Sequence, residues 1–520
     1  MDLQLTLILH KAAAQCPQQR ALHYAGEDFS YESFTQRVAK LAQVLHQHGV
    51  GANDRVGMLA LNSHRFVEFY FGTWWAGAVV NPVNIRWSAR EIAYSLDDCD
   101  TQVLLVDDQF LPLLPEIRQH SRALRTVIYA GNGTAPPDLP SYEDLLAGAS
   151  PAADAQRQGD DLAAIMYTGG TTGKPKGVML SHRNLLSNAL SVLIAVPRSS
   201  SAIALVCAPI FHIGGWGMVL QSLHSLSTLV MLPMFNPQTV LQAITTQRAT
   251  EMFLVPTMLK MLMEHPEFAQ HDMGSIATLI YGAAAIDESL LLQAMRAFTN
   301  ARFYQAYGMT ECAPVTSILA HEDHLPQAGQ PARLRSAGRP VAISHVRIAD
   351  TENQELPRGQ VGELQVRGPH VMQGYWNQPA ATASSLAQGW MHTGDGAYQD
   401  EAGYLYVVDR VKDMIITGGE NVYSAEVENA LAELPAVLMS AVIGIPDAVY
   451  GESVHAVIQL RPGHELTEEQ VITHCKTLIA SYKCPRSVEF RSELPLSAAG
   501  KLQKFQLRAP YWANHTRNIA

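Results

Sequence analysis

Charged residues are scarce in this sequence, and basic residues are the scarcer kind. Among 520 residues, 37 are Lys or Arg and 48 are Asp or Glu, which gives a formal net charge of −11. No block of Lys and Arg stands out along the chain. Because proteins that bind nucleic acids carry a basic patch or stripe, this composition argues against a nucleic-acid partner.

Cysteine is also scarce, and its spacing is uninformative as a motif. None of the cysteines forms a Cys-x-x-Cys pair, and the six are widely scattered: Cys16, Cys99, Cys207, Cys312, Cys475 and Cys484. In a chain of this length, such scattering predicts free thiols in a reducing compartment.

Long hydrophobic runs are absent as well. Nowhere do 18 apolar residues follow one another, so no transmembrane segment is expected. The start of the chain, Met1 to Leu5, lacks the basic region and the cleavage site of a secretory signal. These absences predict a cytoplasmic protein; contact with a membrane surface and assembly into a homodimer are left open.

The length and the pattern of apolar residues predict several α/β units. A chain of 520 residues is too long for one hydrophobic core, so two or more domains are expected. Strands that alternate with helices favour a parallel sheet covered on both faces. The first 160 residues predict helices at 31–49 and 66–78, strands at 55–60 and 102–106, a loop at 81–86 and a linker between subdomains at 131–160.

The most informative stretch is Tyr167 to Gly177, which holds four glycines, three threonines and two lysines. It follows an apolar run, 162–166, that predicts a buried strand. Glycine lets backbone N–H groups approach an anion closely, while Thr hydroxyls and Lys side chains add donors and charge. The stretch therefore predicts a phosphate-binding loop. It is not a Walker A loop, because Gly173-Lys174 is followed by Pro175 and the residue five positions before Gly173 is Thr168.

Further polar motifs follow predicted strands. The segment 209–218 places His212 and aromatic residues among glycines, which suggests a cleft wall or a core histidine. Thr310 and Glu311 follow the strand-like run at 303–308, and their oxygens suit Mg²⁺ on a nucleotide. Asp395 follows Thr-Gly in a turn, where a carboxylate can accept both ribose hydroxyls or simply form a local turn.

The last part of the chain changes character. Residues 338–375 predict short antiparallel strands, and a charged joint at 409–413 separates two further strands. We expect a domain boundary at this joint. Beyond it, helices at 425–433 and 468–479 and strands at 440–445 and 453–460 predict a small α+β domain.

Taken together, the motifs resemble the acyl-CoA synthetases of the adenylate-forming, AMP-binding superfamily. Six stretches in the same order carry this resemblance: 167–177, 307–311, 393–395, 409–413, 418–423 and 496–501. The resemblance implies an α/β fold with αβαβα-layered subdomains, a small β subdomain and a smaller mobile α+β C-terminal domain. The implied domains are residues 1–410 for adenylation and residues 411–520 for the mobile domain.

The resemblance also implies a reaction in two halves. A carboxylic acid attacks the α-phosphate of ATP and gives an acyl-adenylate and pyrophosphate. Coenzyme A then displaces AMP and gives a thioester. ATP, Mg²⁺ and coenzyme A are thus the expected cofactors, and catalysis would rest mainly on positioning and electrostatics.

Individual roles follow from the same resemblance. The phosphates of ATP would be held by Thr168, Gly169, Gly170, Thr171, Thr172, Gly173, Lys174 and Lys176, and Mg²⁺ by Thr168 and Glu311. The adenine, α-phosphate and ribose would contact Ala284, Gln305, Ala306, Tyr307, Thr310, Asp395 and Arg410. Lys501 would supply positive charge at the reacting groups, Lys412 would be the hinge, and Gly418, Gly419 and Glu420 would meet the pantetheine. Two departures from the usual family pattern are Lys504, where arginine is frequent, and Ser424, where proline is frequent.

The identity of the acid is the least determined point. By the resemblance, the acyl group would lie beside His212, Gly214, Gly215, Trp216, Tyr281 and Gly282. These segments contain no Arg or Lys, which disfavours a dicarboxylic acid. The segment 307–314 resembles the fatty-acid branch and favours a medium- or long-chain fatty acid; an aryl acid of the cinnamate or benzoate kind is the alternative.

Other activities on the same fold are the luciferase reaction and the loading of a carrier protein, although no carrier domain is present in this chain. A catalytically dead nucleotide sensor is a different kind of alternative. It predicts loss of Lys501 or Glu311, and the sequence contains both.

Overall fold

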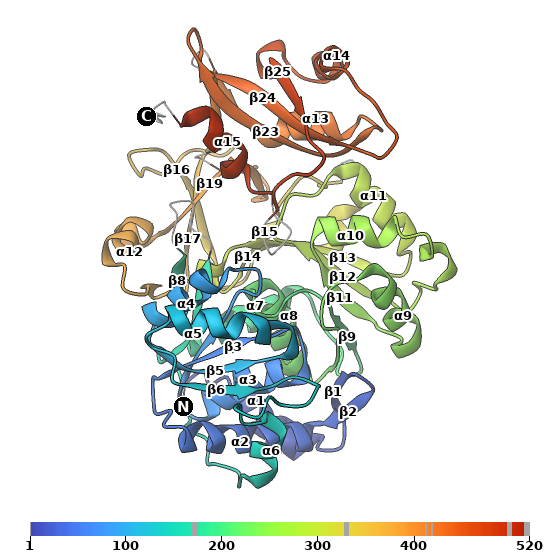
Figure 1. Ribbon diagram of the computed structural model, residues 1–520. Helices are drawn as coiled ribbons and strands as arrows, with labels where there is room; N and C mark the ends of the chain where they lie inside the picture. Colours follow the sequence, from blue (N-terminus) through green and yellow to red (C-terminus); the bar gives the residue numbers. More distant parts are fainter. Residues whose placement is uncertain are drawn as a thin grey trace.

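The computed structural model describes residues 2–168, 175–326, 332–410, 413–417, 420–496 and 502–513. Four sheets organise this part of the chain, three of them before residue 411 and one after it (Figure 1). Among the described helices, none combines the length and the apolar character needed to cross a membrane.

The first sheet has seven strands. Their spatial order is β18 (Gly374–Tyr375), β8 (Lys176–Ser181), β7 (Leu162–Thr168), β4 (Val79–Pro82), β3 (Arg55–Leu59), β5 (Thr101–Val106) and β6 (Thr126–Tyr129). The strands from β7 to β6 are parallel, while β8 and β18 pair antiparallel. The parallel sheet expected from the alternating pattern is therefore present.

The second sheet has nine strands. Their order is β15 (Arg339–Pro340), β14 (Val315–Leu319), β13 (Arg302–Gly308), β12 (Thr278–Gly282), β11 (Glu251–Leu254), β9 (Ile203–Val206), β10 (Thr228–Met231), β1 (Arg20–Tyr24) and β2 (Glu27–Ser30). Its central strands, from β13 to β1, are parallel. The chain thus contributes its first two strands to the second sheet before it builds the first.

Helices arrange these sheets into five layers. The outer face of the first sheet carries α4 (Ala89–Asp98) and α5 (Leu114–His120), as Figure 1 shows, and the outer face of the second carries α9 (Pro237–Gln247), α10 (Pro256–Met263) and α11 (Glu288–Ala297). Between the sheets lie α3 (His64–Trp75), α7 (His182–Ala195) and α8 (Ile213–His224), with α2 (Tyr31–Gln47) packed on α3. The αβαβα layering implied by the resemblance is confirmed.

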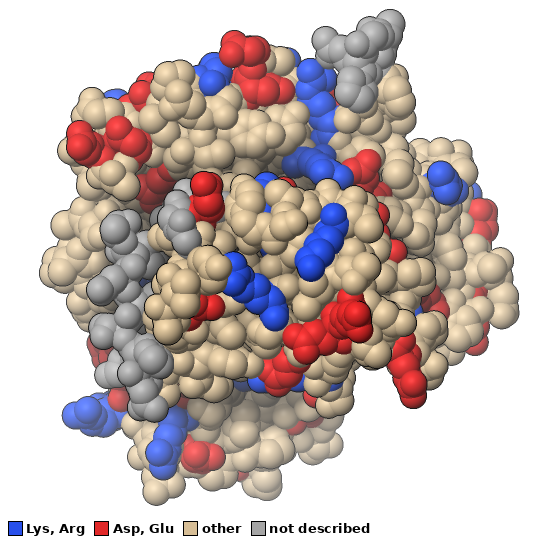
Figure 2. All heavy atoms as spheres, turned by 90° about the horizontal axis from the view of Figure 1, so that it is seen from above, with Lys and Arg blue, Asp and Glu red and all other residues tan. Residues whose placement is uncertain are grey.

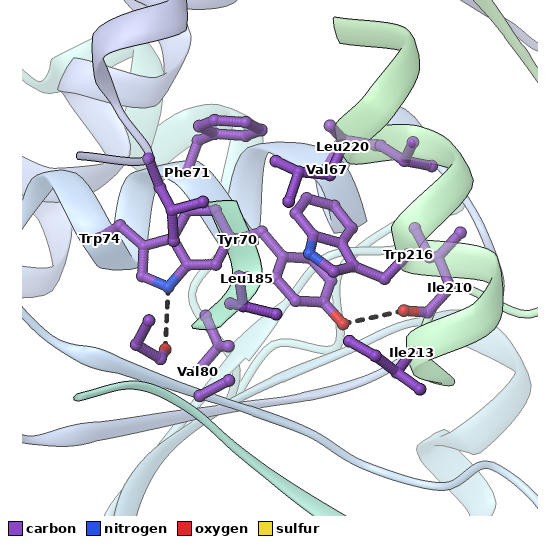
Figure 3. Packing of buried hydrophobic residues seen from close by; sticks show 14 of the residues in the cluster. Val67, Tyr70, Phe71, Trp74, Val80, Leu185, Ile210, Ile213, Trp216 and Leu220 are labelled. Carbon is purple, nitrogen blue, oxygen red and sulfur yellow. Dashed lines mark hydrogen bonds between the residues drawn. The ribbon is translucent and has the colours of Figure 1, made fainter. Parts of the chain in front are cut away.

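Large aromatic side chains fill the middle layer (Figure 3). The Trp216 ring on α8 stacks on the Tyr70 ring on α3 at 3.5 Å between centroids, and both are fully buried. Two polar atoms of this layer donate to backbone carbonyls of other elements: Tyr70 Oη to that of Ile210 and Trp74 Nε1 to that of Ala163, both at 2.8 Å. Burial of such rings contributes about 2 kcal/mol or more each, so this layer fixes α8 firmly against α3.

A four-stranded antiparallel sheet follows, with β16 (His345–Ala349), β17 (Gly362–Arg367), β19 (Met391–Gln399) and β20 (Leu405–Arg410). The chain leaves this sheet at Arg410 and enters the last sheet at Ile415. That sheet contains β22 (Glu420–Val422), β21 (Ile415–Thr417), β24 (Gly451–Leu460), β23 (Val437–Asp447) and β25 (Ser487–Phe490), with helices α13 (Ser424–Ala432), α14 (Glu468–Leu478) and α15 (Lys504–Trp512). We call residues 415–513 the C-terminal unit, which lies above the rest in Figure 1.

Two polar contacts connect the C-terminal unit to α10. Lys260 Nζ donates to the carbonyl oxygen of Leu438 at 2.6 Å, and Arg461 Nη1 lies 2.9 Å from Glu264 Oε1. Figure 2, which views the molecule from this side, shows basic and acidic side chains interspersed over large uncharged areas.

Some expectations about elements were wrong. The predicted loop 81–86 begins inside β4, which is a central strand of the first sheet. The predicted linker 131–160 contains the helix α6 (Tyr142–Gly148), and it joins β6 to β7 within one sheet instead of connecting subdomains. The glycine-rich stretch after His212, for which no element was predicted, is the first turn and a half of α8.

Candidate active site

Several polar motifs meet at the carboxyl ends of the parallel strands, which is where ligands bind in open α/β sheets. Thr168 is the last residue of β7, and Thr310 and Glu311 form a short 3₁₀ turn just after β13. Helix α7 stabilises this turn, because Asn188 Nδ2 on α7 donates to the carbonyl oxygens of Cys312 at 3.2 Å and Val315 at 2.7 Å.

Glu311 is a buried carboxylate, with 7% of its surface exposed. Its Oε1 accepts a hydrogen bond from Tyr375 Oη at 2.9 Å, and Lys176 Nζ lies 5.0 Å from the centre of the same Tyr375 ring. Burial, followed by the nearby Glu311 charge, raises the pKa of Tyr375 well above its usual value, so the phenol stays a donor. A residue of the phosphate-loop strand and the carboxylate are thus linked through one tyrosine.

These oxygens fit a magnesium ion that also binds phosphate. Mg²⁺ on a nucleotide takes one or two carboxylates plus phosphate oxygens and waters. Within the described residues, no group of three or more His, Cys, Asp or Glu side chains could hold a metal by itself. A single buried carboxylate beside a phosphate-loop strand agrees with a metal that comes with its nucleotide.

A second buried carboxylate lies across from the Glu311 turn. Asp395 on β19 is 5% exposed, and its Oδ2 accepts a hydrogen bond from Tyr307 Oη at 2.5 Å. Asp395 pairs in register with Arg410 on β20, so the backbone places the two predicted ribose residues side by side. Tyr307, expected beside the adenine, is therefore also a direct partner of the expected ribose-binding group.

An apolar cavity of about 140 Å³ opens next to this turn. Its lining includes Gly308, Met309 and Thr310 at the turn and a stripe of α8 that runs from His212 to Gln221. No Lys, Arg, Asp or Glu occurs among the described residues that line it. A cavity of this size accommodates an aromatic ring.

Of the residues expected to contact the acyl group, His212, Gly214 and Gly215 line the cavity. Position 215 also requires glycine for a structural reason, because a Cβ there would lie 2.2 Å from the carbonyl oxygen of Pro209. Ala306, Tyr307 and Thr310 line the same cavity.

The other three expected acyl contacts lie away from the cavity lining. Trp216 points into the core of the middle layer, as Figure 3 shows. Tyr281 is fully buried and hydrogen-bonded to His324 at 2.8 Å. At Gly282 a Cβ would lie 2.1 Å from the carbonyl oxygen of Ala306, so glycine is needed there for close strand packing. Periodicity within α8 explains Trp216: on one helical turn, the flanking residues face the cavity and Trp216 faces the opposite way.

Nearby, Ala283 adopts a left-handed φ of 65° directly after β12 and lines the cavity, whereas its neighbour Ala284, the expected adenine contact, lies outside the lining. Gln305 precedes Ala306 on β13. Glu420 begins β22 and is exposed. These three positions keep their expected roles as predictions.

A buried polar network behind the cavity escaped the sequence analysis. Arg198 and Glu251 form an ion pair at 2.8 Å with side-chain exposures of 0% and 4%. Burial lowers the pKa of Arg198 and raises that of Glu251, because desolvation penalises both charges. The only sequence signal was Glu251 as a charged residue next to an apolar strand, and a single charged residue predicts no partner.

Several expected residues lie outside the described part of the chain: Gly169, Gly170, Thr171, Thr172, Gly173, Lys174, Lys412, Gly418, Gly419 and Lys501. The backbone of Arg410 is described as part of β20 and its side chain is not.

The layered fold, with a buried carboxylate on the turn that borders an apolar cavity, is that of an adenylate-forming enzyme. Residues 9–376 match the AMP-binding enzyme family, and residues 426–501 match the AMP-binding enzyme C-terminal domain. The chain therefore belongs to the AMP-binding enzyme family, and its resemblance to acyl-CoA synthetases, which are acid–thiol ligases, is confirmed.

Three similar proteins illustrate the range of acids in the family. A feruloyl-CoA synthase of Amycolatopsis is 38% identical over 96% of this chain and 97% of its own length. A long-chain-fatty-acid–CoA ligase of Mycobacterium tuberculosis is 33% identical over 97% of this chain and 98% of its own. The crystal structure of an anthranilate CoA ligase with anthranoyl-AMP has a TM-score of 0.90 and 26% identity, covering 98% of this chain and 97% of that one.

Proposed function

We propose that the protein is an AMP-forming coenzyme A ligase for an aryl monocarboxylic acid of the cinnamate kind. The observation that carries this proposal is the cavity next to Thr310, which has room for an aromatic ring and an uncharged described lining. A second carboxylate would be buried there without a partner, at a cost of several kcal/mol. The similarity to a feruloyl-CoA synthase supports the same choice.

The reaction would start with attack of the acid on the α-phosphate of ATP, with loss of pyrophosphate. The thiol of coenzyme A would then attack the acyl carbon, with loss of AMP. Mg²⁺, held by Glu311 and Thr168, would neutralise charge on the phosphate oxygens. Asp395 with Arg410 would bind the ribose, Thr310 would contact the α-phosphate, and Lys501 would stabilise the charge that develops between acid and phosphate.

The domain limits 1–410 and 411–520 belong to this proposal, with Lys412 as the hinge. Rotation at the hinge would exchange Lys501 for the loop that contains Gly418 and Glu420 between the two half-reactions. Closure during adenylation would also keep water away from the adenylate. The six free cysteines, five of them buried, fit a reducing compartment, and we place the protein in the cytoplasm.

A medium-chain fatty acid is the second candidate. Met218 and Met258 line the cavity, and flexible thioether side chains adapt well to alkyl groups. The sequence analysis favoured fatty acids of medium or long chain. The polar network at the inner end of the cavity limits its depth, which argues against a long chain.

Pyrophosphate release with ATP and Mg²⁺ tests the proposal. The panel of acids runs from acetate to oleate and includes benzoate and cinnamate, each with and without coenzyme A. We expect the highest kcat/KM on cinnamate-type acids and acyl-CoA formation only when coenzyme A is present. If kcat/KM were highest on an alkyl acid, the proposed substrate class would be wrong and the proposed ligase activity would stand. Pyrophosphate release from none of the acids would contradict the proposed function.

A further inference from the structure

Gln221 is a polar group at the inner end of the acyl cavity. It lies on α8, lines the cavity and is 4% exposed. Arg198, a partner of its side chain, is in turn paired with Glu251, the first residue of β11. The turn after β13 and residue Val255 lie at the carboxyl ends of the strands, whereas Glu251 lies at the amino end of β11. Gln221, which is linked to Glu251 through Arg198, therefore lies at the inner end of the cavity.

The depth of the cavity follows from two independent elements. Gln221 is eight residues after Ile213 on α8, which corresponds to about 12 Å along the helix. Val255 and Glu251 are four residues apart at β11, which corresponds to about 13 Å along a strand. The two estimates of the depth of the cavity agree. A cavity of this depth has room for an aromatic ring that is separated from its carboxylate by a short spacer.

The hydrogen bonds of Gln221 determine which way its amide points. Arg198 Nη2 lies 2.8 Å from Gln221 Oε1. A guanidinium group only donates hydrogen bonds, so the amide oxygen must face Arg198 and the NH₂ group must face the other way. Gln221 Nε2 lies 3.6 Å from where a Cβ on Gly217 would be, and this position is also next to Pro314 in the cavity wall.

No residue in the described part of the chain accepts a hydrogen bond from Gln221 Nε2. An amide N–H at the wall of a cavity that has no acceptor from the protein is available to donate to an occupant of the cavity. The donor is also held rigidly, because Arg198 Nη1 is bonded to Glu251 at 2.8 Å and to Ser222 Oγ at 2.9 Å. The Arg198 charge is neutralised by Glu251 and does not face a second carboxylate.

We propose that Gln221 determines substrate specificity by donating a hydrogen bond to an oxygen atom at the far end of the acyl group. This inference rests on the proposed function and refines its substrate class to aryl acids with a hydroxyl or methoxy oxygen on the ring, opposite the carboxylate-bearing arm. Both oxygens accept a hydrogen bond, so the site selects an acceptor and not a donor. Arg198, itself paired with Glu251, holds the amide in the required orientation.

The test compares kcat/KM for cinnamate, 4-hydroxycinnamate and 4-methoxycinnamate in pyrophosphate release. The unmodified protein should prefer both oxygenated acids over cinnamate by about tenfold, the usual effect of one buried hydrogen bond. Gln221→Met keeps the length of the side chain and removes the donor, so this preference should fall to about onefold.

Ser222→Ala is the matched control. Ser222 is fully buried, bonds to Arg198 and lies outside the cavity lining, so this variant disturbs the same network without touching the substrate. It should keep the preference for oxygenated acids. Gln221→Glu is a second variant, whose carboxylate still accepts from Arg198 and offers no N–H, and it should lose the preference as Gln221→Met does.

The possible results separate the two proposals. Equal rates on all three acids with the unmodified protein, or a preference that survives in either Gln221 variant, would overturn the role of Gln221 and leave the ligase proposal intact. A preference lost equally in Ser222→Ala would reduce Gln221 to a structural residue. Pyrophosphate release from no acid at all would contradict the proposed function itself.

Discussion

Gly215 and Gly217 flank Trp216 on α8 and have different physical reasons to be glycine. A Cβ on Gly215 would lie 2.2 Å from the Pro209 carbonyl oxygen, whereas a Cβ on Gly217 would meet Pro314 and Gln221 at 3.4–3.6 Å, which is ordinary contact. Glycine at 215 is therefore needed because the backbone of Pro209 lies close, whereas glycine at 217 keeps part of the cavity open.

Gly217→Ala should therefore raise stability and lower activity. Alanine in a helix interior is favoured over glycine by up to about 1 kcal/mol, while the added methyl group fills part of the cavity. We expect a higher Tm and a lower kcat/KM that falls more for cinnamate than for a short alkyl acid. Gly215→Ala is the control and should lower the Tm; equal Tm changes in both variants would show that the distinction is wrong.

Tyr307 gives a prediction about nucleotide binding. Tyr307→Phe removes the hydroxyl that donates to Asp395 and should loosen the proposed ribose-binding carboxylate. Since hydrogen bonds to charged groups are worth about 1.5–3 kcal/mol, we expect the KM for ATP to rise about tenfold or more.

Tyr404→Phe provides the comparison for this experiment. Its hydroxyl donates to Asp323 at 2.6 Å, a similar pair that lies elsewhere in the molecule. The KM for ATP should not change in this variant. A rise of the same size in both variants would point to general destabilisation and remove the argument for Asp395.

At this scale the sequence predicted residues that belong to continuous motifs, such as Thr310, Glu311 and Asp395. It did not predict Gln221, Arg198 and their buried network. Partners that come from 198, 221 and 251 meet only after two helices and a strand have packed, and no local pattern contains that information.

At the scale of elements, α7 anchors the 3₁₀ turn that carries Thr310 and Glu311. Asn188 is fully buried; its Nδ2 donates to the carbonyl oxygens of Cys312 and Val315, and its Oδ1 accepts from the N–H of Val315. One side chain thus satisfies three backbone groups of the segment that follows Thr310 and Glu311.

Asn188→Ala should lower both stability and kcat. It leaves buried backbone groups without partners, at about 1–3 kcal/mol each, and frees the turn that carries Glu311. Urea unfolding and pyrophosphate release would measure the two effects. Asn184→Ala, one turn earlier, removes the capping box of α7 and its bonds to 369–371, so it should lower stability with a smaller loss of kcat. Equal losses of kcat in both variants would contradict the anchoring role.

The elements that the sequence predicted best are long and periodic, such as α2 and α14, where burial follows the helical period. Short elements failed for identifiable reasons. Pro82 suggested a loop, yet it ends a central strand where a missing N–H is tolerated. The strands β1 and β2 were missed because they are short and partly polar, and α15 because Pro510 lies inside it.

The two departures from the usual family pattern also meet at this scale. Lys504 on α15 is hydrogen-bonded to Ser424 at the start of α13, and its Nζ lies 2.8 Å from Glu428. The two helices of the C-terminal unit are joined by the residues that replace the more frequent arginine and proline. Because Lys504 and Ser424 are 80 residues apart in the sequence, the sequence alone did not indicate that they are in contact.

For the molecule as a whole, buried histidines determine how stability depends on pH. Burial lowers the pKa of His182, His224, His324 and His370 to about 4 each. Between pH 4 and the usual value of about 6.5, unfolding therefore takes up protons, and the free energy of unfolding rises with pH. Each histidine contributes up to about 1.4 kcal/mol per pH unit in this window.

The urea concentration at the midpoint of unfolding should accordingly fall by several tenths of a molar or more between pH 7.5 and pH 5.0. His324→Gln removes one of the four groups and should make the dependence shallower, even though it loses the bond to Tyr281. A midpoint that is constant over this range, or a slope unchanged in the variant, would show that these side chains are already protonated in the folded protein.

The contacts between α10 and the C-terminal unit have a consequence for the timing of catalysis. Arg461 with Glu264 is an exposed ion pair, worth about 0–1 kcal/mol, and Lys260 with Leu438 is a single hydrogen bond, worth about 0.5–1.5 kcal/mol. Two links of that size add at most a few kcal/mol to the docked arrangement. In the proposed mechanism the C-terminal unit visits two arrangements in every turnover, and weak links favour this exchange because tighter ones would make its release the slowest step.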